Sequence, residues 1–436
     1  MQKIKTNEMM LYRNMIYQEL FDDFGWLIEH VDDEYYNDED KISLLYESVN
    51  SLIEVSENYG LEGNLFHSFL AFMIAYNENA FSTSCEFQSA REGSINHIAV
   101  HDLIIFKKLM EYDLTILDKT LDTDAIAMIV EYSNGGRTGK VFNKRIRDRI
   151  LGLTRELEGS KDVSDYFKYV TDFYRHYGVG KFGLNKAFRL TGDDDNEFEI
   201  TPITSIQHIQ LEDLVGYELQ KKQLIDNTEA FINGKKANNV LLFGDSGTGK
   251  SSSIKAILNK YFDQGLRMIE VYKHQFGALS ELIERIKDRH YKFIIYMDDL
   301  SFEEFEIEYK YLKAIIEGGL AKKPDNVLIY ATSNRRHLVK EKFSDNTGSD
   351  GDLHVNDTVQ EKLSLFARFG LSIYYGSPDM KEFKNIVKRL AERNNVEIDE
   401  EKLYIEATKW EMRMGGLSGR TAEQFINHLL GSDVAF

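Results

Sequence analysis

The sequence predicts an α/β protein in which a mainly helical N-terminal domain is followed by a parallel five-stranded sheet and a small C-terminal helical lid. Beyond about residue 205, short apolar runs alternate with helical segments, as they do in βα units. The runs are nearly continuous in Val, Ile, Leu and Phe, which is typical of strands buried on both faces of a parallel sheet. The expected strands are Val240–Phe243, Met268–Tyr272, Phe293–Met297, Val327–Ala331 and Leu371–Tyr375.

The segments on either side of the expected sheet have helical periodicity. In the first 177 residues, apolar side chains recur at spacings of three and four, as in Leu103, Phe106 and Met110. The glycine-punctuated stretch 178–183 indicates a domain edge. We therefore expect an N-terminal helical domain at residues 1–190, a linker at 191–210, a core at 211–376 and a helical lid at 377–436.

Composition limits the class of protein. The chain has 436 residues, of which 42% are hydrophobic, and this proportion excludes a wholly disordered chain. Lys and Arg total 53 against 72 Asp and Glu, so the net charge of -19 argues against a nucleic-acid coat protein. The sequence contains no apolar run of about 18 residues that could span a bilayer and no N-terminal secretion signal. One cysteine, Cys85, excludes an intrachain disulfide and suits the cytoplasm, where we expect the protein.

A phosphate-binding loop is the most specific motif. Gly244–Ser251 matches G-x-x-x-x-G-K-[ST] between an expected strand and a good helix former, a context that disfavours a chance match. Its glycines let the backbone aim N–H groups at phosphate oxygens, Lys250 neutralises the β- and γ-phosphates, and the Ser251 hydroxyl holds Mg²⁺. The residues expected to contact the nucleotide are Gly244, Asp245, Ser246, Gly247, Thr248, Gly249, Lys250, Ser251 and Ser252.

Polar side chains end the two expected strands that follow. Phe293–Met297 leads into Asp298, which suits a Mg²⁺ ligand, and Asp299, which could polarise an attacking water. A solvated turn is the alternative, and the upstream loop makes it the weaker one. Asn334 ends the next strand, where it could reach the γ-phosphate or merely form a turn with its own backbone. The residues alone leave both readings of Asn334 open.

Residues from about 205 to 436 resemble the AAA+ superfamily of P-loop NTPases. The resemblance implies a three-layer core, ATP and Mg²⁺ as ligands, ATP hydrolysis and a homo-oligomer. It assigns Gly244–Ser251 to Walker A, Asp298 and Asp299 to Walker B, Asn334 to sensor 1, Arg368 to the arginine finger, Arg420 to sensor 2, and Gly216 and Tyr217 to the adenine pocket. Several strings, among them YGVGKFGLNKAF and EKLSLFARFGL, also resemble a bacterial AAA+ family known only as a domain of unknown function.

Three assignments keep alternatives. Asp299 stands where the superfamily usually has Glu, so Glu303 or Glu304 could be the catalytic base instead. Arg368 either reaches a neighbouring subunit's site or pairs with a carboxylate of its own domain. Arg420 faces the same choice.

Three functions follow from these motifs. The favoured one is an oligomeric ATPase that remodels or loads a macromolecular partner, an unidentified protein, with the N-terminal domain as adaptor. The alternative is a nucleotide-dependent switch, similar to a helicase loader, in which slow hydrolysis times release; the acidic charge does not support a nucleic-acid partner. A P-loop kinase is disfavoured because the sequence shows no acceptor pocket.

Overall fold

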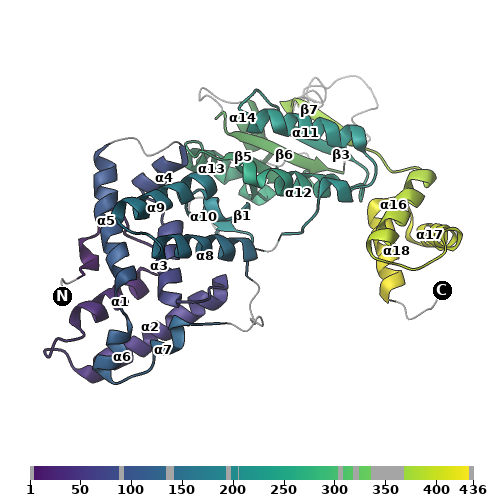
Figure 1. Ribbon diagram of the computed structural model, residues 1–436. Coiled ribbons are helices and arrows are strands. Elements are labelled where there is room, and N and C mark those ends of the chain that lie inside the picture. The colour runs from purple at the N-terminus through teal and green to yellow at the C-terminus, as the bar shows by residue number, and fades with distance from the viewer. Residues whose placement is uncertain are drawn as a thin grey trace. The chain divides into compact units, whose positions relative to one another are not determined.

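The chain divides into two compact units between Asn185 and Lys186, and each is described by itself (Figure 1). The computed structural model describes residues 4–87, 93–133, 142–192, 198–204, 206–302, 308–317, 324–334 and 368–431. Within these residues, no helix is both long and apolar enough to cross a bilayer.

The first unit is built from helices around the buried helix α3, Leu65–Tyr76. This helix is apolar on every side, so it can only be stable if its neighbours cover its whole circumference. Leu103, Phe106 and Met110 are buried on α5, which confirms the helical periodicity. The helices are η1 Thr6–Glu8, α1 Gln18–His30, α2 Asp38–Tyr59, α3, α4 Ala80–Phe87, α5 Ser94–Glu111, α6 Thr115–Leu121, α7 Ala127–Val130, α8 Lys144–Glu158, α9 Val163–Tyr177 and α10 Gly180–Leu184.

A buried carboxylate anchors the N-terminal segment of this unit to α5. Asp102 is fully buried, and its carboxylate accepts hydrogen bonds from the backbone N–H groups of Met10 at 3.0 Å, Leu11 at 2.7 Å and Tyr12 at 3.2 Å. These three donors face one carboxylate that satisfies all of them. Without the carboxylate these N–H donors would have no acceptor, and a buried donor without an acceptor lowers the free energy of unfolding.

The second unit contains a seven-stranded sheet in the order β2-β1-β4-β5-β6-β3-β7. All neighbouring strands pair in parallel except the terminal β1–β2 pair. The strands are β1 Ala187–Thr191, β2 Glu199–Pro202, β3 Val240–Gly244, β4 Leu266–Glu270, β5 Lys292–Met297, β6 Val327–Ser333 and β7 Leu371–Tyr375.

The predicted α/β class and its five parallel strands are confirmed, but the sheet is larger than predicted. The five expected strands are β4-β5-β6-β3-β7, and β1 and β2 extend the sheet beyond β4. Both extra strands come from residues that the sequence assigned to the end of the helical domain and to the linker. Both strands are short and partly polar, and β2, which forms the edge of the sheet, ends in Pro202, so they lack the nearly continuous apolar run of the central strands. Strand β4 also begins two residues earlier than expected.

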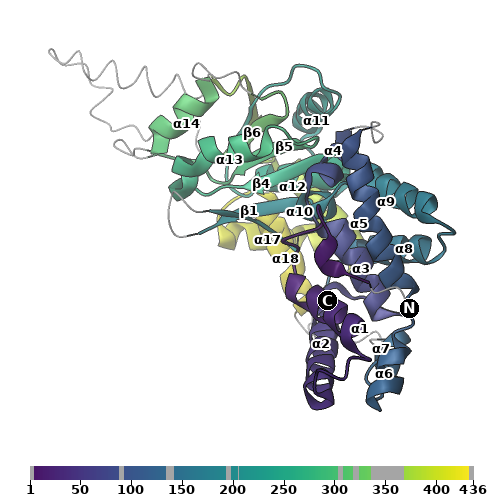
Figure 2. The same cartoon turned by 90° about the vertical axis from the view of Figure 1, so that its left-hand side faces the viewer.

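Helices cover both faces of the sheet and make the three-layer core. Helices α11 and α12 lie on one face and α13 and α14 on the other (Figures 1 and 2). The lid has its own small core, which includes Phe383, Ala407 and Phe425. The remaining elements are η2 Leu211–Asp213, α11 Glu218–Ile232, α12 Lys250–Tyr261, η3 Phe262–Gln264, η4 Lys273–Ala278, α13 Leu279–Ile286, α14 Glu308–Glu317, and in the lid α16 Met380–Arg393, α17 Glu400–Met414 and α18 Gly419–Gly431.

We predict that Asp102→Ala destabilises the first unit by about 3 kcal/mol, because buried donors lose a charged acceptor. The two tryptophans are Trp26 and Trp410, so a Trp410→Phe background makes fluorescence report on the first unit alone. Urea unfolding in that background measures the loss. Asp102→Asn, which keeps one carbonyl acceptor, is the matched control and should lose less; equal losses for the two variants would contradict the anchoring role.

Candidate functional site

The loop between β3 and α12 is shaped by close backbone approaches. Gly244, Gly247 and Gly249 all have positive φ, at 133°, 74° and 90°, where other residues are strained. A Cβ on Gly244 would lie 2.1 Å from the carbonyl oxygen of Tyr375 in the neighbouring strand β7. A Cβ on Gly247 would lie 3.0 Å from the Ser418 hydroxyl in the lid. The absence of a side chain at Gly244 therefore lets the loop pack against strand β7, and its absence at Gly247 lets the lid pack against the loop.

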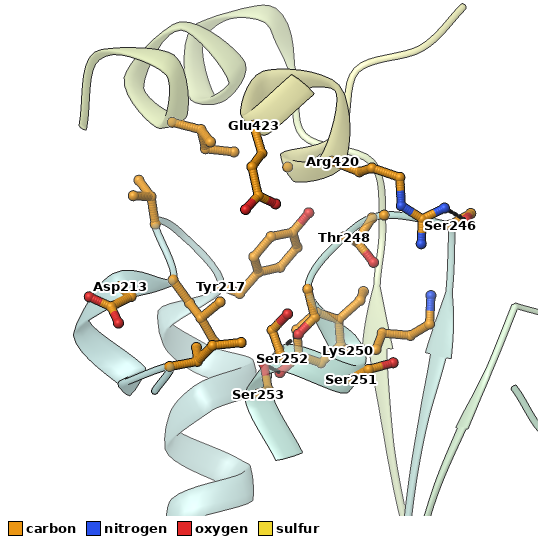
Figure 3. Close-up of a pocket in the computed structure, with 18 of the residues that line it drawn as sticks. Asp213, Tyr217, Ser246, Thr248, Lys250, Ser251, Ser252, Ser253, Arg420 and Glu423 are labelled. Carbon is orange, nitrogen blue, oxygen red and sulfur yellow. Dashed lines mark hydrogen bonds between the residues drawn. The ribbon is translucent and has the colours of Figure 1, made fainter. Parts of the chain in front are cut away.

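A pocket of about 540 Å³ opens beside this loop, a volume that suits a small-molecule ligand. The loop and the first turn of α12, the carboxyl edge of the sheet and the lid together form its wall (Figure 3). The lining includes Ser246, Gly247, Thr248, Gly249, Lys250, Ser251 and Ser252 from the loop and α12, Asp298, Asp299 and Asn334 from strand ends, and Arg420 and Glu423 from the lid. The four residues expected at strand ends and in the lid, namely Asp298, Asp299, Asn334 and Arg420, thus line the same cavity as the loop.

The loop lysine points back over its own loop. Lys250 is 5% exposed, and its Nζ donates to the carbonyl oxygens of Gly244 at 3.0 Å and Asp245 at 2.6 Å. Burial lowers the pKa of the Lys250 ammonium, and the carboxylates of Asp245 and Asp299 act in the opposite direction. A buried cation is stabilised by a nearby anion, so the loop suits an anionic ligand such as a phosphate group.

The first aspartate after β5 connects two neighbouring elements. Asp298 Oδ1 accepts hydrogen bonds from Ser251 Oγ at 2.7 Å, at the start of α12, and from Thr332 Oγ1 at 2.5 Å, on β6. Burial raises the pKa of Asp298, but the hydrogen bonds from Thr332 and Ser251 outweigh it and hold the pKa below its usual value. Asp298 is therefore a carboxylate at neutral pH.

Ser251 and Asp298 fit Mg²⁺ bound together with a nucleotide. Mg²⁺ usually takes one or two carboxylates and completes its octahedron with substrate phosphates and water. One hydroxyl and one carboxylate, 2.7 Å apart beside the phosphate loop, supply the protein's share of such a set. Among the described residues, no cluster of three or more His, Cys, Asp or Glu could hold a metal ion without such help.

The second aspartate is held by the neighbouring strand. Asn334 Nδ2 donates to Asp299 Oδ1 at 2.7 Å, and the Asp299 N–H donates to Thr332 Oγ1 at 2.9 Å. Asp299 also has a φ of 50°, in the left-handed region. The side chain of Asn334 therefore contacts Asp299, and its role towards the γ-phosphate stays a prediction. Glu303 and Glu304, the other candidate bases, lie outside the described residues.

Sequence reasoning missed Thr332, which bonds to both aspartates. Its signal was the two-residue period of a strand: Thr332 on β6 lies two residues before Asn334, which follows the end of β6, so both side chains are expected on the same side of the sheet. The other missed residues are Asp213 and Arg393, whose side chains form a 3.1 Å ion pair between η2 and the lid. Because 180 residues separate them, no local pattern could have connected them.

The lid meets the loop through Arg420. Its backbone N–H donates to the Gly247 carbonyl oxygen at 3.2 Å, and its Nη1 donates to Ser246 Oγ at 3.4 Å. Glu423, one turn further along α18, extends towards Tyr217 (Figure 3). The guanidinium group thus lies beside the phosphate loop of its own chain.

The apolar end of the pocket contains one of the two expected adenine-pocket residues. The Tyr217 ring stacks on Tyr375, with centroids 5.0 Å apart, and its hydroxyl donates to the Gly376 carbonyl oxygen at 2.8 Å. Ile386 and Leu390 of the lid also line the pocket. Gly216, by contrast, lines a neighbouring cavity next to α11.

Two expected site residues have other surroundings. The Asp245 carboxylate accepts hydrogen bonds from the backbone N–H and hydroxyl of Ser377, at 2.8 and 2.9 Å, so it connects the loop to the segment that leads into the lid. Arg368 is half-buried just ahead of β7 and is not among the residues that line the pocket. The structure does not bring Arg368 to the site of its own chain.

Comparison with known proteins identifies a family. Residues 184–433, more than half of the chain, match the family described as "Protein of unknown function (DUF815)". No curated protein matches the sequence. Solved structures of RuvB variants from Thermotoga maritima are similar at 16%, 17% and 16% identity, with TM-scores of 0.32, 0.32 and 0.33; they cover 50%, 50% and 52% of this chain and 72%, 72% and 75% of their own.

We predict that Gly244→Ala abolishes nucleotide binding and lowers the thermal midpoint of the second unit, because its Cβ meets the Tyr375 carbonyl oxygen. The matched control is Gly234→Ala, which has a φ of 71° but no atom within 4 Å of the new Cβ. The control should cost only the strain of a left-handed residue, about 1–2 kcal/mol. Thermal unfolding and binding of a fluorescent ATP analogue measure both effects. Equal destabilisation by the two variants would show that the approach to β7 is unimportant.

Proposed function

The chain belongs to the family described as "Protein of unknown function (DUF815)", and we propose that it is an ATPase that binds MgATP beside Gly244–Ser251 and hydrolyses it. One observation carries the proposal. A continuous hydrogen-bond network runs from Ser251 through Asp298, Thr332 and Asp299 to Asn334, beside the buried ammonium of Lys250. This network supports the proposal, because Ser251 and Asp298 could bind a metal ion, Asp299 could act as a base, and Asn334 lines the same pocket.

In the proposed transfer of the γ-phosphoryl group to water, each residue of this pocket has a separate role. Lys250 and the N-terminus of α12 would hold the β- and γ-phosphates, and Ser251 and Asp298 would hold Mg²⁺, which neutralises charge on the phosphate oxygens. Asp299 would accept a proton from the attacking water, while Asn334 orients that water. Arg420 lies by the loop, where a cation can stabilise charge on the γ-phosphate.

The base and ribose would lie at the apolar end. Tyr217 and its stacking partner Tyr375 form one wall, and Ile386 and Leu390 of the lid face the pocket as well. Because the lid supplies part of this lining, nucleotide binding and lid position are coupled in the proposed cycle. Gly216 contributes a left-handed turn, with a φ of 81°, that lets the chain enter α11 beside the pocket.

We assign Arg368 to the site of a neighbouring subunit in a homo-oligomer. Its position outside the pocket of its own chain agrees with an arginine supplied across an interface. The oligomer would use ATP to remodel or load a protein partner in the cytoplasm, with the N-terminal helical domain as adaptor and residues 377–436 as the lid. The net charge of -19 disfavours nucleic acid as that partner.

We predict that Lys250→Ala weakens ATP binding by about 10- to 100-fold, because a hydrogen bond to a charged group contributes about 1.5–3 kcal/mol. Lys260→Ala, on the exposed last turn of the same helix, is the control and should bind normally. Titration with a fluorescent ATP analogue measures both.

Asp299→Asn should bind ATP and lose turnover. Wild-type protein that binds ATP tightly but hydrolyses it only in the presence of a partner would favour the switch function instead.

We predict that Arg368→Ala binds ATP with unchanged affinity but loses about 10³-fold in kcat, the lower end of the effect of an arginine finger. Wild-type turnover per chain should rise steeply with protein concentration, because each site needs a neighbour. Mixing Arg368→Ala with Lys250→Ala chains should restore part of the activity, since each supplies what the other lacks. Normal hydrolysis by Arg368→Ala, or turnover independent of concentration, would rule out a shared site.

A further inference from the structure

Tyr296 lies directly beneath the proposed metal site, in a position that the roles above leave unexplained. It precedes Asp298 by two residues at the end of β5, so both side chains project towards the same face of the sheet. That face packs against α12, whose first turn carries Ser251. The side chain of Tyr296 is 3% exposed.

The hydroxyl of Tyr296 has polar neighbours but no hydrogen bond of regular geometry. Its Oη is inaccessible to water and makes no such bond with any described residue, although Ser251, Asp298 and Thr332 lie within reach of it. Two tyrosines on the same sheet behave differently: Tyr330, its register partner on β6, bonds to Thr228 at 2.8 Å, and Tyr375 donates to Ser253 at 3.1 Å. A buried hydroxyl without a regular hydrogen bond costs free energy, so one next to a polar site needs a reason.

The neighbours of this hydroxyl are the groups of the metal site. Asp298, Ser251 and Thr332 are the polar side chains that act on it. A neutral phenol carries one O–H donor, so it can help the negatively charged Asp298 carboxylate by donating a hydrogen bond. Both hydroxyls that already bond to Asp298, those of Ser251 and Thr332, donate to Oδ1. A carboxylate has about four acceptor positions, so a third donor can be accommodated.

We propose that Tyr296 is a positioning residue for the magnesium site, whose hydroxyl donates a hydrogen bond to the Asp298 carboxylate when Mg²⁺ and nucleotide are bound. With donors on β5, β6 and α12, the carboxylate is held against rotation and faces Ser251. The role rests on the proposed function, because it exists only if Ser251 and Asp298 hold Mg²⁺. Partners of metal ligands in this position are typically worth 10–100-fold in metal affinity.

The phenol-to-phenyl substitution separates this role from a merely structural one. Tyr296→Phe removes one oxygen and keeps the ring, so the core packing is preserved. If the hydroxyl were only an unsatisfied buried group, its removal would raise the thermal midpoint and leave metal binding unchanged. If it positions Asp298, the affinity for Mg²⁺ falls. A merely structural hydroxyl therefore affects the thermal midpoint, and a positioning hydroxyl affects the affinity for Mg²⁺.

The test compares the Kd of a fluorescent ADP analogue in EDTA and in saturating Mg²⁺, because the ratio of the two constants reports how strongly the site holds Mg²⁺. We expect Tyr296→Phe to leave the Kd in EDTA unchanged and to reduce the Mg²⁺-dependent gain in affinity by about 10-fold. Tyr330→Phe is the matched control, since its hydroxyl is partnered and remote from Asp298. It should lower the thermal midpoint and leave the gain unchanged.

The outcomes distinguish the two proposals. A wild-type gain that Tyr296→Phe preserves would overturn the role of Tyr296 and leave the proposed function standing. A wild-type protein whose ADP affinity is the same in EDTA and Mg²⁺ would overturn both. A gain that falls equally in Tyr296→Phe and Tyr330→Phe would show that sheet packing, and not a hydrogen bond to Asp298, is responsible, and would also overturn the role.

Discussion

The carboxylate of Asp298 is the group on which the candidate site depends. Its oxygen Oδ1 accepts hydrogen bonds from the first turn of α12 and from β6. The carboxylate therefore ties the phosphate loop to the acidic strand end. Because β3, β5 and β6 are parallel, their carboxyl ends meet at one edge, and the loop, the aspartates and Asn334 all emerge there.

A second constraint joins this edge to the lid. Only a glycine at position 244 allows the loop to lie against the carbonyl oxygen of Tyr375, and the residues after Tyr375 lead into the lid. Asp245 accepts a hydrogen bond from Ser377, and Tyr217 donates one to Gly376, so the loop and Tyr217 both hold this short segment. A displacement of the loop by bound phosphate would act on the attachment of the lid at once, while Arg420 contacts the loop from the other side.

Much of the sheet could be predicted because its four central strands, β3, β4, β5 and β6, are buried on both faces. Such strands are nearly continuously apolar, which made them recognisable. The hairpin β1–β2 was not recognised, because both strands are short and mix buried with less buried residues. For the candidate site, the loop and Asp298 followed from a motif with a strict local spacing. Asp245 shows the limit of that reasoning, since its place in the motif does not reveal that its carboxylate binds Ser377.

The sequence by itself determined the phosphate loop, the acidic strand end and the α/β class, because each depends on neighbours along the chain. Only the tertiary structure decided which side chains meet. Thr332 bonds to two aspartates, Arg393 pairs with Asp213, and the buried hydroxyl of Tyr296 makes no hydrogen bond of regular geometry within the part of the chain that the structure describes. These contacts depend on strand order and on the packing of the lid, which bring together residues far apart in the chain. A hydrogen bond acts over about 3 Å in space, whatever the separation in sequence.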